Sequence, residues 1–507
     1  METATPTLAA PAAALGRAHA LFLEKRDADA LPLARRAADA LPRRADAWTL
    51  LGIVQQRLGQ PRAAEAAYRE AIRVQPDYAD AWTNLGNLLR DRNDRHGALL
   101  AFQQALRHAP RSPEPAYNLG VALERFGLWE GALAAFQAAV DCDPQHVDAH
   151  WNSALGLLRA GRFEEGFREY EWRFRRGEPE PRDCIQPVWD GRPLQYRTLL
   201  VWAEQGFGDV LQFLRFVPVV ARLGGRVVLE VPDGLQGLAA RIPGVAAVSV
   251  RGATPPPTFD THVALMSLPH VLGLSPSASH LSSREPRPAH APAHADAPTQ
   301  ARAPVKSHAP AHAPAHAPYL HAHDGLAWQW RDRLAASGHC PGRDLAFGLV
   351  WAGNPALRNS RERSPGFDAV RALLDVPGTR CYSLQKGAGC DQLVGRARLP
   401  RFVDLQREIA HFDDTAAIIA NLDVVVTCDT AVAHLAGALG KPTFVMLPHA
   451  PDWRYGLDPH ASAWYPSMRL FRQATPDDWT DVVARVGRAL EEAVASLPSQ
   501  TLGRMHA

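Results

Sequence analysis

The sequence predicts two kinds of structure in one chain: an N-terminal array of helical repeats, then a region in which strands and helices alternate. Three observations lead to this fold class, α followed by α/β. The first third of the 507-residue chain repeats itself every 34 residues. After Pro187, short apolar and β-branched runs alternate with helical patterns, as in a parallel sheet covered by helices. One stretch, Asn421–Pro448, has the full strand–helix–strand pattern of a βαβ unit.

The 34-residue period is carried by residues of one kind at equivalent places. A proline, a glycine and an aromatic residue recur in step: Pro42, Pro76, Pro110 and Pro144; Gly52, Gly86 and Gly120; Tyr68, Phe102, Phe136 and Tyr170. In stacked helix pairs the small residue admits a neighbouring helix, and the aromatic ring fills the space between units. The pattern resembles tetratricopeptide repeats, with four repeats over about Ala45–Arg182 and a weaker one around Ala13–Leu41.

Such an array has no catalysis of its own, and its concave face commonly binds a peptide or a partner domain. We therefore expect a protein partner or an acceptor there, with a purely scaffolding or dimerising role as the alternative. Asn84, Asn118 and Asn152 repeat in step and should line one helix face. They would either clamp a peptide backbone or bond between helices.

Composition argues against several classes of protein. The formal net charge of +2 favours neither a nucleic acid nor a membrane surface as partner. No apolar run reaches membrane-spanning length, and the N-terminus lacks a signal-peptide pattern. The six cysteines show no metal-ligand spacing. We therefore expect a cytoplasmic protein without a membrane span.

Changes of pattern predict five segments. The array should occupy 1–182, a first α/β half 183–281, a second half with a final helix 326–497, and a flexible tail 498–507. Between the halves, 282–325 is mostly Ala, Pro and His, so we expect a disordered insert. Its seven histidines could bind a metal, but prolines deny them a fixed geometry.

The strands follow from the apolar runs of the α/β region. We expect Thr198–Ala203, Arg226–Val231, Ala246–Val250, His262–Met266, Ala346–Trp351, Arg380–Leu384, Phe402–Leu405, Val424–Cys428 and Thr443–Leu447. An apolar helix should run through Leu223, and the final amphipathic helix should start at Thr475 with Pro476 in its first position. The helix Ala431–Leu439 should take its N-cap from Asp429 or Thr430 and end at Gly440.

Candidate site residues lie where strands end, because open α/β sheets bind ligands beyond the carboxyl ends of their strands. They are Glu204, Gly206, Gly208 and Asp209 in the first half and Gly353, Asn354, Lys386, Asp429, Thr430, Ala431 and His434 in the second. Asp209 is either a general base for an acceptor hydroxyl or a helix-start acid favoured by the dipole. The helix start near Thr430 and His434 suits the diphosphate of a sugar nucleotide. The alternative there is an ordinary capped turn with a core histidine.

Cations could neutralise a departing diphosphate. Arg361 and Arg363, with Arg358, form a basic loop that either serves this purpose or is simply solvated. No Asp-x-Asp motif occurs in the α/β region. We therefore expect neither a metal nor another cofactor, with amides and cations stabilising the leaving group.

Six stretches of the α/β region together carry a family resemblance: Trp202–Asp209, Val350–Pro355, Ser383–Gly387, Cys428–Ala436, Pro451–Tyr455 and Trp464–Pro466. They resemble glycosyltransferase family 9, which contains the lipopolysaccharide heptosyltransferases, and in particular bacterial proteins that fuse tetratricopeptide repeats to such a domain. The resemblance implies a GT-B fold of two Rossmann-like halves, a nucleotide-sugar donor held mainly by the second half, and metal-independent inversion. It also implies Asp209 as the base and Asp429, Thr430 and His434 as donor-binding residues.

Together these features predict a glycosyltransferase that moves a sugar from a nucleotide-sugar donor to a hydroxyl of a protein, lipid or glycan, with the array docking the acceptor or a partner. Asp209 would deprotonate the hydroxyl while the helix start at Thr430 and His434 stabilises the leaving diphosphate. Two alternatives remain. One is a non-catalytic scaffold with a degenerate nucleotide-sugar-binding domain, and the other is an enzyme similar to the protein O-GlcNAc transferases, which also join repeats to a GT-B domain.

Overall fold

The computed structural model describes residues 9–177, 182, 184–253, 255–273, 318–339, 342–356, 360–395 and 399–497. The tail at 498–507, most of the histidine-rich insert and Arg358 lie outside these ranges. The chain divides into two compact units, Met1–Gly156 and Leu157–Ala507. In the described part, no helix combines the length and apolar character that a membrane crossing requires.

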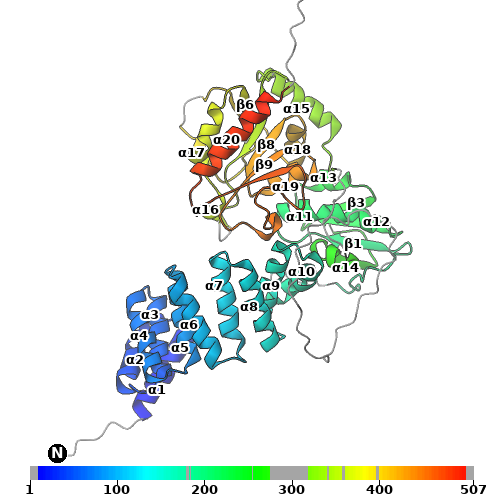
Figure 1. The fold of residues 1–507 in the computed structure, drawn as a ribbon. Helices are drawn as coiled ribbons and strands as arrows, with labels where there is room; N and C mark the ends of the chain where they lie inside the picture. The colour runs from blue at the N-terminus through cyan, green and yellow to red at the C-terminus, as the bar shows by residue number, and fades with distance from the viewer. Residues whose placement is uncertain are drawn as a thin grey trace, which may run out of the picture. The chain divides into compact units, whose positions relative to one another are not determined.

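The first unit is a row of helix hairpins (Figure 1). The pairs are α1 (Ala9–Leu23) with α2 (Asp27–Ala40), α3 (Ala45–Arg57) with α4 (Pro61–Val74), α5 (Ala79–Asp91) with α6 (Arg95–His108), and α7 (Pro113–Arg125) with α8 (Trp129–Cys142). Helix α9 (Val147–Arg159) follows them. The periodic proline precedes α3, α5, α7 and α9, and the short connections force neighbouring helices to run antiparallel, so the array predicted from the 34-residue period is confirmed.

The periodic glycines and aromatic rings meet inside these hairpins. The contacts are Gly52 with Tyr68, Gly86 with Phe102, and Gly120 with Phe136. A Cβ added at Gly52 would lie 2.5 Å from Cε1 of Tyr68, and that ring is fully buried. The glycine therefore makes room for the ring of its own pair, which is why the two residue types recur together.

The periodic asparagines are engaged within the array. Asn84 and Asn118 each donate to a backbone carbonyl one turn earlier in the same helix, at 2.8 and 2.9 Å. Asn152 lies 3.4 Å from the hydroxyl of Tyr117 and so bonds between helices. Of the three periodic asparagines, only Asn152 therefore bonds between helices, which was one of the two predicted roles.

The second unit contains two parallel sheets (Figure 1). The smaller has the order β3-β2-β1-β4, with β1 (Thr198–Trp202), β2 (Arg226–Val231), β3 (Val245–Val250) and β4 (Thr261–Ala264). The larger has the order β10-β9-β8-β5-β6-β7, with β5 (Leu345–Val350), β6 (Thr379–Ser383), β7 (Phe402–Asp404), β8 (Val424–Cys428), β9 (Thr443–Leu447) and β10 (Met468–Arg472). In each, the chain builds outward from a central first strand, first to one side and then to the other. This doubly wound arrangement places a switch point between β1 and β4 and another between β5 and β8.

All nine expected strands are present, with ends within two residues of the predicted ones. The edge strand β10 was missed, because Arg469 and Arg472 interrupt its apolar run. On one face of the larger sheet, side chains of β5 and β8 pack against α17 (Phe367–Val370) and α20 (Thr480–Ala495). Helix α19 (Ala431–Ala438) packs on β8 and β9, and α18 (Phe412–Ala420) packs against α19 and α15 (Asp324–Ala336).

Three helix predictions need correction. The expected single helix through Leu223 is split into α11 (Phe207–Phe213), the 3-10 turn η2 (Leu214–Phe216) and α12 (Val217–Ala221). The final helix starts at Thr480, not at Thr475, because Asp477 adopts a left-handed backbone (φ 63°) between Pro476 and the helix. Its predicted apolar face is nevertheless buried.

The third correction concerns the end of the insert. Helix α15 (Asp324–Ala336) begins before the predicted limit at residue 325, and the chain is packed from Pro318 onward. Tyr319 donates to the carbonyl of Leu211 at 3.0 Å, and Leu320 is 2% exposed. These two large side chains supply the contacts that the Ala-Pro-His composition lacks.

Helix α10 (Phe163–Tyr170) and the 3-10 turn η1 (Glu171–Arg176) belong to the second unit. Phe167 packs edge-on against Phe213 of the first half and against Trp453 and Trp464 of the second. Tyr170, the last member of the 34-residue series, bonds through its hydroxyl to the side chain of Gln205. The helical pattern that extends the repeats to residue 182 therefore ends inside the α/β unit.

Candidate functional site

The carboxyl ends of β5 and β8 are adjacent, as their switch point requires. A Cβ added at Gly353 would lie 3.7 Å from the carbonyl oxygen of Asp429 and 3.7 Å from Cγ2 of Thr430. The amide of Gly353 donates to Oγ of Ser364 at 3.1 Å, which holds the loop after β5 in place. Three of the predicted site residues thus meet at one corner of the larger sheet.

Asp429 is buried and doubly bound. The hydroxyl of Tyr455 donates to its Oδ1 at 2.8 Å, and Nη2 of Arg363 lies 2.6 Å from its Oδ2. Burial raises the pKa of Asp429, against the opposing effect of Arg363. The predicted N-cap role is therefore wrong for Asp429, because its carboxylate is turned to these two side chains.

The start of α19 has no side-chain cap among the described residues. Thr430 occupies the cap position with an extended backbone, but its hydroxyl lies 3.0 Å from that of Thr427 and bonds there. Ala431 is the first helical residue and is half-buried. The first amides of this eight-residue helix thus keep their affinity for an anion.

His434 is buried in the second turn of α19. Its Nδ1 lies 3.1 Å from the hydroxyl of Tyr465. Burial, assisted by Arg454, lowers the pKa of His434 to about 3. The imidazole is therefore neutral at neutral pH, so it can form hydrogen bonds but cannot supply a charge to a diphosphate.

The two halves approach each other at this histidine. A Cβ added at Gly208 would lie 2.9 Å from Cδ2 of His434 and 3.6 Å from Cα of Ala431. Helices α11 and α19 accordingly pack side by side. Gly208 of the first half and Ala431 and His434 of the second half are therefore in close contact, and this meeting place of the two halves is called the crevice below.

Asp209 lies in that crevice at the first turn of α11. Its Oδ2 accepts the amide of Gly206 at 3.0 Å, and its Oδ1 is paired with Nη2 of Arg454 from the second half. The carboxylate keeps a fifth of its surface exposed. Asp209 thus satisfies its own helix start, as the second interpretation expects, and it also pairs with an arginine of the opposite half. Its role as a general base stays a prediction.

Arg454 is the central residue that sequence reasoning missed. It lies on the 3-10 turn η7 (Trp453–Tyr455), in the loop beyond the carboxyl end of β9. Its Nη1 bonds Asp452 at 2.7 Å, and its guanidinium stacks 4.4 Å from the Trp453 ring. The available signal was the position of the Pro451–Tyr455 stretch after a central strand.

Two guanidinium groups of the crevice have unused donors. The Nε of Arg454 and the Nε of Arg363 are both buried without a hydrogen-bond partner among the described residues. Asp452 lies close enough to both arginines that both lower its pKa. Nε of Arg173, Arg380 and Arg472 is likewise buried without a partner among the described residues, so the two free donors are compatible with the oxygens of an anion but are not specific to such a site.

Glu204 does not line the crevice as predicted. It is 1% exposed, and its Oε1 accepts from Nη2 of Arg173 at 2.9 Å. Arg173 is buried too and also donates to Ser267 at 2.7 Å. Glu204 therefore anchors η1 to the first sheet, and burial raises its pKa.

Three other predicted residues lie apart from the crevice cluster. Lys386 donates to backbone carbonyls of the loop after β7, Gln406 at 3.2 Å and Ile409. Asn354 is exposed and closes its own turn, accepting the amide of Ala356 at 3.0 Å. Arg361 is exposed to solvent, on the four-residue helix α16 (Ser360–Arg363).

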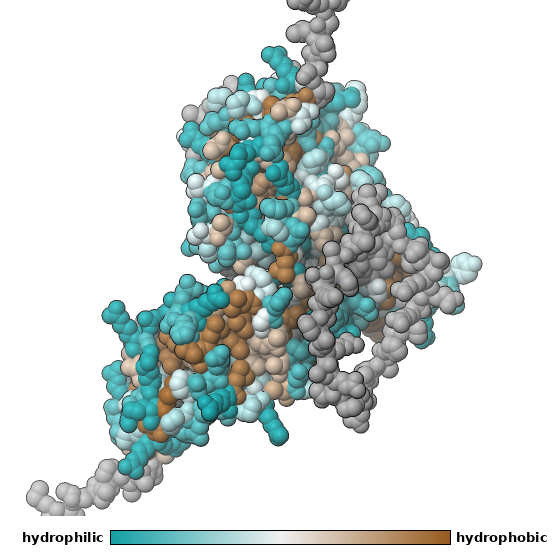
Figure 2. Space-filling view, in the orientation of Figure 1, coloured by the Kyte–Doolittle hydropathy of each residue, from teal (hydrophilic) through white to brown (hydrophobic). Residues whose placement is uncertain are grey.

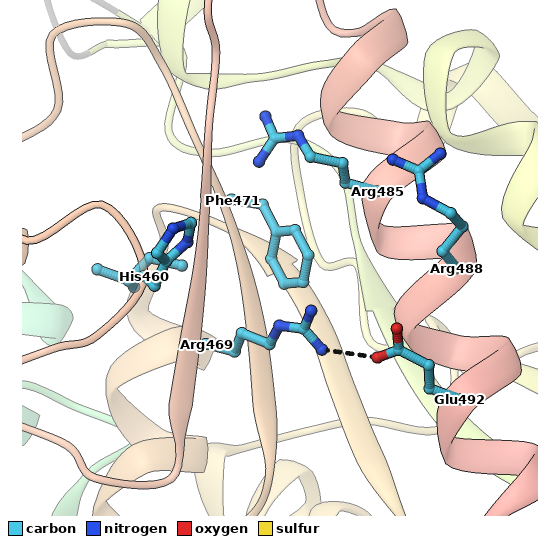
Figure 3. A pocket seen from close by; sticks show the side chains of 7 residues that line it. His460, Arg469, Phe471, Arg485, Arg488 and Glu492 are labelled. Atoms are coloured by element: carbon cyan, nitrogen blue, oxygen red, sulfur yellow. Dashed lines mark hydrogen bonds and ion pairs between the residues drawn. The ribbon is translucent and has the colours of Figure 1, made fainter.

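A separate pocket of about 230 Å³ lies between the edge strand β10 and α20. Figure 3 shows its arginines, with Arg469 reaching to Glu492 at 3.1 Å. None of the predicted site residues lines it. In the ranges that the structure describes, no cluster of three or more His, Cys, Asp or Glu residues could hold a metal ion.

Comparison with known proteins identifies the array. A family model described as tetratricopeptide repeat matches residues 49–94 and 83–147, which confirms the repeat type. Protein FlbA of Caulobacter vibrioides is 28% identical over 350 residues, which is 66% of this chain and 53% of that protein. The chain thus spans about half the length of that relative.

Two solved structures are similar to about a third of the chain. The pilF protein of Pseudomonas aeruginosa is 20% identical, with 34% of this chain and 78% of that chain covered and a TM-score of 0.32. A tetratricopeptide-repeat protein of Thermus thermophilus is also 20% identical, with 34% and 93% covered and a TM-score of 0.30.

Proposed function

We propose that the chain is a glycosyltransferase that moves a sugar from a nucleotide-sugar donor to a hydroxyl acceptor, and that its two parallel-sheet halves form a GT-B fold. One observation carries the proposal. Asp209, beyond β1 of one doubly wound sheet, is ion-paired with Arg454, beyond β9 of the other, directly beside His434 and the start of α19. This contact supports the proposal, because direct displacement on a nucleotide sugar requires a base close to the groups that bind the leaving diphosphate.

The proposed reaction is a single displacement. The carboxylate of Asp209 removes the proton of the acceptor hydroxyl. The hydroxyl oxygen forms a bond to the anomeric carbon while the bond from that carbon to the diphosphate oxygen breaks. The nucleoside diphosphate leaves with the electron pair, and the configuration of the carbon inverts.

In the proposal, hydrogen-bond donors that are already in place stabilise the leaving diphosphate. The first amides of α19 would supply partial positive charge, and Arg363 and Arg454 full positive charge. Neutral His434 contributes a hydrogen bond from Nε2 when its Nδ1 accepts from Tyr465. In the proposed mechanism these residues take the role that a metal has in other enzymes, in line with the lack of an Asp-x-Asp motif in the α/β region.

The repeat array would dock the acceptor or a partner protein. Tetratricopeptide arrays use their surfaces in this way. Figure 2 shows apolar residues gathered on the visible face of the array, and Leu100 of α6 is 47% exposed. A hydrophobic surface of this kind suits a protein ligand.

The test is a panel of nucleotide sugars carrying UDP, ADP, GDP or CDP. We expect one of them to raise the melting temperature of the full chain and to be slowly hydrolysed to the free nucleoside diphosphate. Asp209→Asn should lower that turnover by about 10² to 10⁴-fold, the usual contribution of a general base, with the melting temperature preserved. If no nucleotide sugar is bound or consumed, the scaffold alternative replaces the enzyme.

A further inference from the structure

The ion pair across the crevice occupies the carboxylate that the proposed reaction needs. Oδ1 of Asp209 is directed at Arg454, and Oδ2 accepts the amide of Gly206 at 3.0 Å. Each oxygen of the carboxylate therefore already has a partner within the protein. The described arrangement is thus that of a site in which the base is held by the opposite half.

Arg454 has a second partner and an unused donor. Nη1 stays bonded to Asp452 at 2.7 Å, whereas Nε is buried with no partner among the described residues. A guanidinium has five N–H donors and binds phosphate oxygens in a two-pronged manner. If Nη1 of Arg454 stays bonded to Asp452, a small rotation of the guanidinium moves Nη2 from the carboxylate of Asp209 to a phosphate oxygen.

We propose that Arg454 is a diphosphate-binding residue that leaves Asp209 for the donor, so that the base becomes free only after the donor has bound. The exchange is a competition between two anions for one cation. It enforces an order of binding, donor before acceptor. The inference rests on the proposed function, because it assumes a donor with a diphosphate.

The competition makes an unusual prediction for the variant Asp209→Asn. The amide keeps the oxygen that accepts from Gly206 but removes the charge that holds Arg454. Calorimetric titration of the full chain with UDP, ADP, GDP and CDP should therefore show about tenfold tighter binding of the preferred diphosphate by D209N than by wild type. Its glycosyl transfer is lost at the same time.

A matched control separates this effect from a general loosening of the two halves. Asp413 is paired with Arg241 at 2.5 Å and also joins the second half to the first, away from Arg454. Asp413→Asn should leave diphosphate affinity unchanged. In the Arg454→Gln background, which should weaken binding by itself, adding D209N should give no further change.

The outcomes are distinct. Unchanged or weaker binding by D209N, with wild type still binding a diphosphate, overturns the inference and leaves the proposed function intact. If D209N also tightens diphosphate binding in the R454Q background, the gain comes from removing the negative charge of Asp209 and not from releasing Arg454. This result also overturns the inference. If wild type and all variants bind none of the four diphosphates, the proposed function fails together with the inference.

Discussion

The repeat array and the crevice of the α/β unit differ in how far apart in the sequence their contacting residues lie. In the array, a residue and its partner lie in adjacent helices, such as Gly86 and Phe102, and the same solution recurs along the chain. In the crevice, Asp209 and Arg454 are separated by 245 positions and meet only once. Contacts that repeat at a fixed spacing can be recognised directly in the sequence. A contact between residues far apart in the chain has to be inferred from which strand ends lie side by side in the sheet.

The largest expected effect is on the buried charges of the crevice. Arg363→Gln leaves the carboxylate of Asp429 buried without its cation, which should lower the free energy of unfolding by about 3 to 5 kcal/mol. Urea unfolding followed by circular dichroism measures the change. The neighbouring Arg361→Gln, on an exposed side chain, should change it by less than about 0.5 kcal/mol.

A double variant checks the cause. Asp429→Asn combined with Arg363→Gln removes both charges and should recover most of the loss. If the double variant is as unstable as Arg363→Gln alone, the destabilisation comes from lost packing and not from an unpaired carboxylate.

A smaller effect is expected in the array. Gly86→Ala places a Cβ 2.7 Å from Cε1 of the buried ring of Phe102, so overpacking should cost about 1 to 3 kcal/mol. The same change at Gly16, where nothing lies within 4 Å of an added Cβ, should be neutral or stabilising by up to about 1 kcal/mol. Equal urea midpoints for Gly86→Ala and wild type would show that the ring moves aside freely.

The smallest effect is a dependence on pH. The folded pKa of His434 is about 3, below its value of about 6.5 in the unfolded chain. Between these values the unfolded chain binds the extra proton, so this stabilisation is complete above about pH 6.5 and is lost as the pH falls. The buried Asp429, whose pKa is raised, contributes in the opposite direction.

The measurement compares wild type with His434→Gln. From pH 6 to pH 5 wild type should lose up to about 1.4 kcal/mol more of its free energy of unfolding than the variant. Parallel pH dependences for the two proteins would mean that the imidazole is protonated as readily in the folded state as in the unfolded chain.

Much of the fold could be predicted from the sequence. The array followed from prolines, glycines and aromatic rings in fixed order, and the strands from buried β-branched runs. The errors arose where one residue overrides a pattern. Asp477, with its left-handed backbone, delays the last helix, and Tyr319 ends the insert earlier than composition indicates.

The site was predictable only in part. Asp209, Asp429 and His434 come together because strand ends of parallel sheets converge, which a sequence reveals. Arg454 and Tyr455 come from a loop without periodicity, so only their position after β9 and the family resemblance of Pro451–Tyr455 could have identified them. Glu204 is a residue that was predicted for the site but does not belong to it. Its position at a strand end does not determine whether its side chain turns to the crevice or to a buried arginine such as Arg173.

The contact of Gly208 with His434 sets a limit on closure. The two halves meet where a hydrogen atom stands in place of a side chain, so the spacing between Asp209 and the start of α19 is fixed by the smallest possible spacer. Any larger residue at that position acts as a wedge that must part the two halves or displace the imidazole of His434.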